Sequence, residues 1–265
     1  MSGWANKVVA VTGGSAGLGR AIARAFRNRG ATVALIARDE KRLQAAASHL
    51  GGDQVLTSVA DVADENQAKA VISDIIERAG RLDVLVNNVG KSVRIELAKA
   101  TPDDYRQYME INFLSAVHCT NAALDALTES SGHIVNIGSL SSKTAWPFLA
   151  PYTTSKFALG AFTHHLRLEG PSNVHYMLVC PGPLKREDAG ERYNEQASEL
   201  PDSARKPAAG ARVRGLEPSL VAEKIVRGCE KRKLEWLPWR LRLGYVALSM
   251  SPRLGDWIIR RKMTK

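Results

Sequence analysis

Short apolar runs alternate with helix-like patterns along most of the chain of 265 residues. A short apolar run predicts a buried strand, and apolar residues three or four positions apart predict an amphipathic helix. Strands that alternate with helices form a parallel sheet covered on both faces, because each helix returns the chain to the start of the next strand. The expected strands are Val8–Val11, Thr32–Ile36, Val55–Val59, Asp83–Val86, His133–Ile137, His175–Val179 and Leu234–Leu237.

The segments between these strands predict five longer helices and one short helix. Thr101-Pro102 marks one helix start and Gly170-Pro171 marks one helix end. We therefore predict an α/β fold, with a doubly wound parallel sheet of about seven strands and helices on both faces, in one domain. The longer helices are expected at about 18–30, 64–79, 101–127, 152–169 and 218–229, and the short one near 189–200.

The composition fits a single globular domain in a reducing compartment. The apolar content of 45% suffices for one sizeable core. The cysteines are Cys119, Cys180 and Cys229, whose spacing suits neither a metal site nor a disulfide framework, so we interpret them as reduced core thiols. Neither a signal peptide nor an apolar run of about 18 residues is present. We expect a cytoplasmic protein without a membrane-spanning helix.

The net charge of +10 is concentrated near the carboxyl end. The last 35 residues hold ten Lys or Arg against two acidic residues, which argues against an evenly basic nucleic-acid-binding protein. Residues 238–265 also contain Trp239, Trp257 and several aliphatic residues, and form a basic amphipathic extension of the domain 1–237. Two interpretations remain open. The extension lies on the anionic inner face of a membrane, or it packs on its own domain or a sister subunit.

The first expected strand leads into the glycine-rich turn Thr12–Gly19, and a helix follows. Gly13, Gly17 and Gly19 permit a tight turn and a close approach of the backbone to a ligand. The start of the helix presents unpaired N–H groups to an anion. Strand, glycine turn and helix in this order are typical of dinucleotide binding, with the pyrophosphate at the helix start. The alternative is a glycine-rich turn that binds no ligand.

Arg38 follows the second expected strand, where enzymes that prefer NAD usually have an acidic residue. Ala37 leaves that place neutral, and Arg38 can pair with a 2′-phosphate through two hydrogen bonds, so NADP(H) is favoured over NAD(H). In the alternative interpretation, Arg38 is a solvated charge beside Asp39. Asp61 and Val62 follow the third strand, where they are expected to border the adenine.

Tyr152 and Lys156 lie four residues apart, on one face of an expected helix. An ammonium group near a phenol favours the phenolate and lowers the phenol pKa from about 10. A tyrosine with a lowered pKa can exchange a proton with an alcohol or a ketone near neutral pH. Most such pairs have no chemical role, so the assignment depends on other motifs along the chain.

Those motifs are the Thr12–Gly19 turn, Asn87–Gly90, Asn112 and Ser139, which stands thirteen residues before Tyr152. In order and spacing they resemble the motifs of the short-chain dehydrogenase/reductase family, of the common, non-extended type. The resemblance is close up to about residue 185 and looser to about residue 237. It implies a Rossmann-like fold and hydride transfer to or from a nicotinamide cofactor.

The resemblance also implies a role for each site residue. Tyr152 would be the general acid or base, and Lys156 would lower the pKa of Tyr152 and bind the nicotinamide ribose. Ser139 would donate a hydrogen bond to the substrate oxygen. Asn112, at a helix kink, would hold a water that links Lys156 to solvent. The expected cofactor contacts are Gly13, Ser15, Gly17, Leu18, Gly19, Arg38, Asp61, Val62, Asn88, Gly90, Tyr152, Lys156, Pro181, Gly182 and Leu184.

One residue departs from the family pattern beside the expected nicotinamide site. Arg186 stands where the family usually has a threonine near the nicotinamide carboxamide. The polar segment Lys185–Glu217, which contains Arg186, is interpreted as a mobile substrate-binding loop. Its composition does not define a substrate.

The leading hypothesis is an NADP(H)-dependent oxidoreductase that interconverts a ketone or aldehyde and a secondary alcohol, on a lipid-like substrate. One alternative is a 3-oxoacyl-thioester reductase whose basic surface receives an acidic carrier protein. An alternative of another class is a regulatory module that binds NADP without catalysis. The helix 152–169 and the helix before it usually form the dimer contact in the family, so a homodimer or homotetramer is expected.

Overall fold

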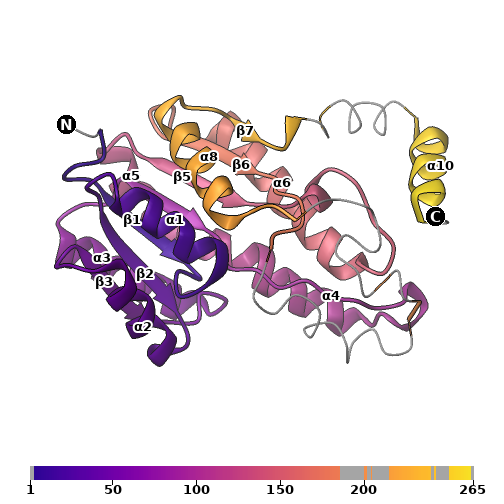
Figure 1. Cartoon of the computed structure of the whole chain (residues 1–265), viewed down its shortest axis with the longest axis horizontal. Helices are drawn as coiled ribbons and strands as arrows, with labels where there is room; N and C mark the ends of the chain where they lie inside the picture. Colours follow the sequence, from indigo (N-terminus) through magenta and orange to yellow (C-terminus); the bar gives the residue numbers. More distant parts are fainter. Residues whose placement is uncertain are drawn as a thin grey trace.

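The protein is described by a computed structural model, in which residues 3–185, 200–201, 204, 215–239, 242 and 251–263 are placed. Seven parallel strands form one sheet in the order β3-β2-β1-β4-β5-β6-β7. The strands are β1 Val8–Thr12, β2 Thr32–Ala37, β3 Val55–Val59, β4 Val84–Asn87, β5 His133–Ile137, β6 His175–Val179 and β7 Glu235–Trp236 (Figure 1). Each expected strand is confirmed, with ends shifted by at most one residue.

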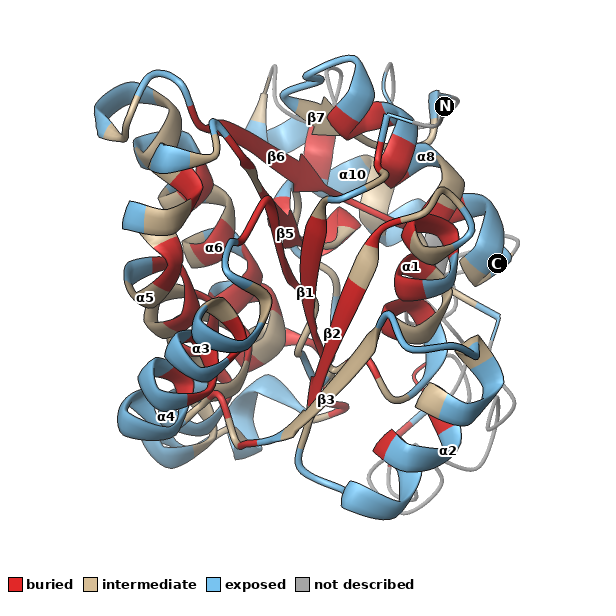
Figure 2. Ribbon diagram, turned by 90° about the vertical axis from the view of Figure 1, so that its left-hand side faces the viewer, coloured by how far each residue is buried: buried red, intermediate tan, exposed pale blue. Residues whose placement is uncertain are grey.

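Helices cover both faces of the sheet (Figure 2). α1, α2 and α8 pack on one face, and α3, α5 and α6 lie on the other with α4 beside them. The predicted doubly wound α/β fold is confirmed. The helices are α1 Gly17–Arg27, α2 Glu40–Leu50, α3 Glu65–Ala79, α4 Pro102–Met109, α5 Ser115–Glu129, α6 Ala150–Glu169, α8 Pro218–Glu230 and α10 Pro252–Met263. Three short turns are η1 Leu97–Lys99, η2 Glu110–Leu114 and η3 Leu140–Ser142.

Two helical segments differ from the sequence prediction. α2 was not among the expected helices, although Asp39 caps its start by accepting a hydrogen bond from the Arg42 backbone N–H at 3.0 Å. The helix expected over 101–127 is divided by η2, a π-helical turn that separates α4 from α5 where the resemblance implied a kink. This turn contains Asn112, so the interruption lies at the one buried polar residue within it.

The strand order reverses direction between β1 and β4, which is where a doubly wound sheet opens a crevice at the carboxyl ends of its strands. At the other end of these two strands, the buried Asp83 carboxylate accepts hydrogen bonds from Lys7, Arg81 and the Val8 backbone N–H. Burial acts to raise the Asp83 pKa, but these hydrogen bonds hold it below its usual value. These hydrogen bonds thus join the start of β1 to the start of β4, at the end of the sheet opposite the crevice.

The described residues also bear on the expectations about cysteines and membranes. Cys119, Cys180 and Cys229 are free and buried, as expected, and burial raises the pKa of each thiol to about 12. Among the residues that the structure places, no helix combines the length and apolarity needed to cross a bilayer.

Candidate active site

The glycine turn after β1 leaves its backbone open to a ligand. Gly13 and Gly17 have φ angles of 64° and 51°, in the left-handed region that favours glycine. A Cβ on Gly19 would lie 2.2 Å from the Gly13 carbonyl oxygen, so no larger residue fits there. Ala16 precedes α1 without a side-chain cap, and the first turn of the helix has no acidic residue. The uncapped helix start and the bare turn fit the pyrophosphate of a dinucleotide.

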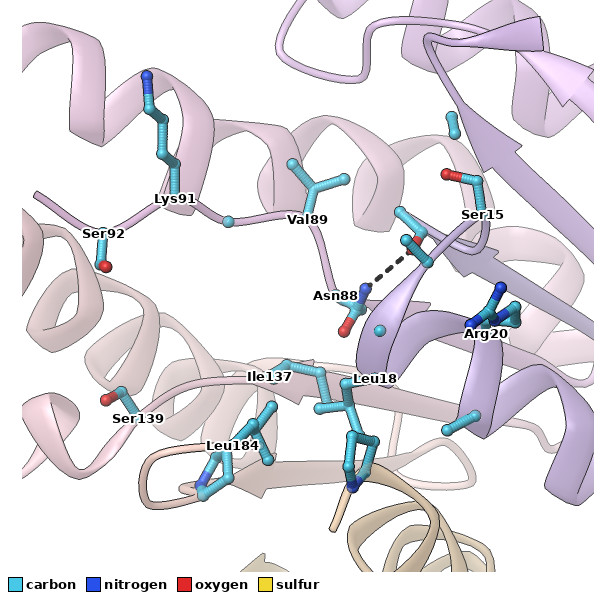
Figure 3. Close-up of a pocket in the computed structure, with 18 of the residues that line it drawn as sticks. Ser15, Leu18, Arg20, Asn88, Val89, Lys91, Ser92, Ile137, Ser139 and Leu184 are labelled. Atoms are coloured by element: carbon cyan, nitrogen blue, oxygen red, sulfur yellow. Dashed lines mark hydrogen bonds between the residues drawn. The ribbon is translucent and has the colours of Figure 1, made fainter. Parts of the chain in front are cut away.

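Thr12 and Asn88 join the glycine turn to the loop after β4. The Thr12 hydroxyl accepts hydrogen bonds from the backbone N–H groups of Asn88 at 2.9 Å and Val89 at 3.1 Å. The Asn88 side chain in turn donates to the Thr12 carbonyl oxygen at 2.9 Å, and it lies beside the turn in Figure 3. These bonds cross the point where the strand order reverses, so they set the width of the crevice there.

Arg38 lies at the far end of the crevice, directly after β2. Its side chain is 75% exposed and pairs with the Asp61 carboxylate at 3.4 Å. Asp61 also accepts a hydrogen bond from the Ala63 backbone N–H at 3.1 Å. Arg20 and Arg42 border the same end of the crevice. The expected adenine end is therefore rich in guanidinium groups, and the one on Arg38 is accessible to an added anion.

Lys156 is the buried cation of the site. Its ammonium group donates to the Ile137 carbonyl oxygen at 2.8 Å, at the end of β5. Burial lowers the Lys156 pKa to about 8. Tyr152 stands one helical turn earlier on α6, and both side chains border the crevice. A buried ammonium group interacts strongly with a negative charge nearby, such as a phenolate, because little water screens the two charges.

Ser139 follows β5 at the opening of η3 and faces the same crevice (Figure 3). Its hydroxyl oxygen accepts a hydrogen bond from the Ser141 backbone N–H at 3.1 Å. That bond fixes the oxygen and leaves the hydroxyl hydrogen for another acceptor. Ser139 can therefore donate to an oxygen atom in the crevice.

Asn112 holds the π-turn against two neighbouring segments. Its amide oxygen accepts from the Lys91 backbone N–H at 2.7 Å, and its amide nitrogen donates to the Lys91 carbonyl at 3.0 Å and to the Ser155 hydroxyl at 2.9 Å. Ser155 donates onward to the Tyr152 carbonyl at 2.7 Å. The amide oxygen and nitrogen of Asn112 are thus both hydrogen-bonded to other groups of the protein. A water relay at this position would use backbone carbonyls of the wider turn, and it stays a prediction.

Gly90 occupies the narrow space between Asn112 and Lys156. A Cβ on Gly90 would lie 3.0 Å from the Asn112 amide oxygen and 3.2 Å from the Lys156 ammonium nitrogen. A side chain here would press on both groups at once. The loop after β4, the π-turn and α6 therefore meet at one point behind the crevice.

These groups share one crevice of about 1840 Å³ that runs from Arg38 to Ser139 and Tyr152. Residues 7–197 match the family described as short chain dehydrogenase. The chain belongs to the short-chain dehydrogenase/reductase family. It is an oxidoreductase of that family, whose fold binds nicotinamide cofactors.

Curated relatives and solved structures resemble this dehydrogenase over most of its length. It is 34% identical to 11-beta-hydroxysteroid dehydrogenase 1A of Arabidopsis thaliana, over 95% of this chain and 74% of that protein. It is 32% identical to the hydroxysteroid 11-beta-dehydrogenase 1-like protein of Xenopus tropicalis, over 97% of this chain and 87% of that protein. A short-chain dehydrogenase from Streptomyces avermitilis superposes with a TM-score of 0.81 at 26% identity, covering 100% of both chains. A variant of actinorhodin polyketide ketoreductase with NADPH superposes with a TM-score of 0.74 at 30% identity, over 83% of this chain and 89% of that chain.

The dehydrogenase brings nearly all the predicted site residues to this crevice. Gly19 and Asn112 are set behind its wall, where they shape the turn and the loop that border it. Arg186 and most of the short helix expected near 189–200 lie outside the described residues. The residues on the wall are Gly13, Ser15, Gly17, Leu18, Arg38, Asp61, Val62, Asn88, Gly90, Ser139, Tyr152, Lys156, Pro181, Gly182 and Leu184.

Arg94 is a site residue that the sequence prediction missed. It is buried at the wall of the crevice, and its guanidinium donates to the Ala204 carbonyl at 2.7 Å and to the Val93 carbonyl at 2.9 Å. Ala204 and Leu200 are buried against Phe148 on the body of the dehydrogenase. The available signal was a lone arginine between the apolar residues Val93 and Ile95.

Proposed function

We propose that the chain is an NADP(H)-dependent carbonyl reductase, which interconverts a ketone or aldehyde and the corresponding alcohol on an apolar, lipid-like substrate. The observation that carries this proposal is the grouping of Ser139, Tyr152 and the buried Lys156 on one wall of the crevice. These three groups supply a hydrogen-bond donor, a proton donor and a cation at the place where a carbonyl would be reduced.

In the reduction, the Tyr152 phenol gives its proton to the carbonyl oxygen, and in the reverse direction the phenolate takes a proton from the alcohol. The Lys156 ammonium favours the phenolate, which makes proton donation easier in the reduction and, in the reverse direction, raises the share of phenolate present near neutral pH. The Ser139 hydroxyl donates a hydrogen bond to the same oxygen, which stabilises its developing negative charge. The bound nicotinamide supplies or accepts the hydride. The backbone of the glycine turn orients that cofactor through its pyrophosphate.

The preference for NADP(H) rests on the charges at the adenine end. Ala37 is neutral, and the exposed Arg38 guanidinium can turn from Asp61 toward a 2′-phosphate. Arg20 and Arg42 add positive charge to the same end of the crevice. Two structural neighbours, described as complexes with 5-hydroxy-NADP and with NADPH, are consistent with this preference.

An apolar substrate fits the described wall beside Tyr152. Leu140, Trp146, Leu149 and Leu184 border this end of the crevice. The relatives named as hydroxysteroid dehydrogenases point to the same class of substrate. Because one structural neighbour is a polyketide ketoreductase, a 3-oxoacyl-thioester substrate remains the alternative. Turnover of a panel of steroid, long-chain, sugar and acyl-thioester ketones distinguishes these classes.

Tyr152→Phe tests whether the chain is an enzyme or a binding module. Loss of the phenolic proton should lower the turnover of every responsive ketone by about 100- to 10,000-fold, the usual contribution of a general acid. Binding of NADPH, followed by fluorescence, should change little. Tyr105→Phe on α4 is the matched control, because Tyr105 is not among the residues of the crevice wall. If the variant at 152 keeps its turnover, Tyr152 is not the proton donor.

Arg38→Ala tests the cofactor preference. Removal of a charged hydrogen-bond donor should weaken NADPH binding by about 1.5–3 kcal/mol and leave NADH binding nearly unchanged. Dissociation constants for both cofactors, measured by calorimetry, give the comparison. Arg78→Ala on α3, where Arg78 pairs with Asp74, controls for the general loss of positive charge. Equal losses for NADPH and NADH would remove Arg38 from the 2′-phosphate site.

A further inference from the structure

α10 stands apart from the sheet and its covering helices (Figure 1). It packs extensively against no other element in the described part of the chain. Its 12 residues span about 18 Å, and an isolated helix of that length is marginal in water. Some further surface is therefore needed to stabilise it.

One face of α10 carries an apolar ridge. Trp257 and Ile258 stand three and four positions after Leu254, so the three side chains lie on one face of the helix. Leu254 is exposed, and Trp257 is 55% exposed although it is the largest side chain of the helix. The Arg261 guanidinium lies over the Trp257 ring, 5.1 Å from its centroid. Arg261 stands four positions after Trp257 on the same face, so the apolar ridge ends in a cation.

The helix as a whole is strongly basic. It contains four basic residues and a single acidic residue, Asp256. Arg253, Arg260 and Arg261 are all exposed. Trp239, at the other end of the extension, is 75% exposed. Cations flanking exposed tryptophan and leucine match the headgroup layer of an anionic bilayer, where indole rings and basic side chains are both favoured.

We propose that α10 is a docking element for an anionic phospholipid surface, on which it lies flat with the Leu254–Trp257–Ile258 ridge inserted below the headgroups. A flat orientation follows from its length, which is far short of the hydrocarbon thickness, and from its charged side. The charge also favours this occupant over a second copy of the chain, because two copies of so basic a helix repel one another. This docking does not depend on the catalytic assignment.

Vesicle co-sedimentation of the full-length protein tests this. One set of vesicles is phosphatidylcholine alone, and the other is equal parts phosphatidylcholine and phosphatidylglycerol. Each basic residue near an anionic surface adds roughly 1 kcal/mol, so partitioning should be at least tenfold stronger on the anionic vesicles and should fall in high salt. The double variant Leu254→Ser/Trp257→Ser should lose roughly tenfold or more, because the ridge no longer inserts. The double variant Arg260→Gln/Arg261→Gln should reduce this preference for anionic vesicles by at least about tenfold.

Leu97→Ser is the matched control, because Leu97 is an exposed leucine on η1 and lies outside the extension. Its partitioning should equal that of the unchanged protein. The ridge side chains are exposed or at the surface, so thermal unfolding of the variants should match the parent. Equal binding to both vesicle compositions, or unchanged binding by the ridge variant, overturns the proposal. A Trp257-dependent oligomer in solution without vesicle binding also overturns it, and assigns the ridge to a second copy.

Discussion

Lys156 carries its ammonium group in a buried position at the crevice wall. A lysine in solution titrates near pH 10.5, and burial lowers this pKa to about 8. Because burial disfavours the ammonium form, the charged Lys156 lowers the stability of the folded state at every pH below about 8. The Ile137 carbonyl at 2.8 Å offsets only part of that cost. A group kept at a cost to folding, beside the proposed proton donor, is more readily explained by reactivity than by stability.

Lys156→Met should therefore stabilise the protein while it abolishes turnover. A shift from 10.5 to about 8 corresponds to a burial cost of about 3 kcal/mol. After loss of the hydrogen bond to Ile137, we expect a gain of about 1–3 kcal/mol in the free energy of unfolding at pH 7. The gain should be full below pH 8 and should shrink as the pH rises toward 10.5, since the unfolded lysine then also loses its proton.

Urea unfolding of the cofactor-free protein at several pH values measures this gain. Lys69→Met, at an exposed lysine of α3, should change stability little and show no such pH dependence. A Lys156→Met variant that is less stable than the parent at pH 7 would show that the ammonium is a net stabilising group.

At the residue scale, the sequence was sufficient where a motif combines residue type with spacing. Ser139, Tyr152 and Lys156 were predicted in this way, and all three line the crevice in the structure. Arg94 could not be found, because its role depends on Ala204, a contact 110 positions along the chain. The hydrogen bonds of Asn112 to Lys91 and Ser155 likewise join segments that are distant in the sequence, so no local pattern predicts them.

At the scale of elements, Arg94 attaches Ala204 to the body of the enzyme. Its hydrogen bond to the Ala204 carbonyl is buried, and Leu200 and Ala204 pack on Phe148 beside it. A buried guanidinium bonded to backbone carbonyls is costly to remove, because those carbonyls lose their donor without gaining water. Among the described residues, Leu200 and Ala204 are thus held by a buried hydrogen bond and by apolar packing at the proposed substrate end of the crevice.

Arg94→Gln should loosen that attachment. We expect the loss of about 1–3 kcal/mol of local stability, because the Ala204 carbonyl is left without its donor. Hydrogen exchange in the peptide that covers residues 200–204 should become faster, and KM for a responsive ketone should rise more than kcat falls. Arg78→Gln, on the exposed side of α3, is the control with the same change of side chain. Unchanged exchange in the 200–204 peptide would contradict the role of Arg94.

The elements themselves were predictable to different degrees, for physical reasons. The strands are short runs buried on both sides, so their apolar pattern marks them clearly. α2 was missed because only Leu43 and Ala46 are buried in it, which leaves a weak periodic signal. The interruption between α4 and α5 was expected only as a kink at Asn112, from the resemblance to the family, since a π-turn adds a residue without a glycine or proline to mark it.

At the scale of the whole molecule, α6 presents an apolar stripe on its outer face. Phe157 is 44% exposed and Leu168 is 68% exposed, and Ala161 and His164 lie between them at helical spacing. The inner face of the same helix carries Ser155 and Lys156 of the proposed site. Contact between two copies through this stripe would brace the helix from behind, as the resemblance to dimeric members of the family led us to expect.

We therefore predict a dimer in solution that forms through the outer face of α6. Each large apolar side chain buried in such a contact contributes about 1.5–3 kcal/mol, so Phe157→Glu/Leu168→Glu should raise the dimer dissociation constant by at least about 100-fold. Size-exclusion chromatography with light scattering, over a range of concentrations, measures the change. Leu220→Glu on α8 is the control, because Leu220 is 48% exposed and α8 covers the opposite face of the sheet. A dimer that survives the α6 variant but dissociates with Leu220→Glu would move the interface to the α8 side of the molecule.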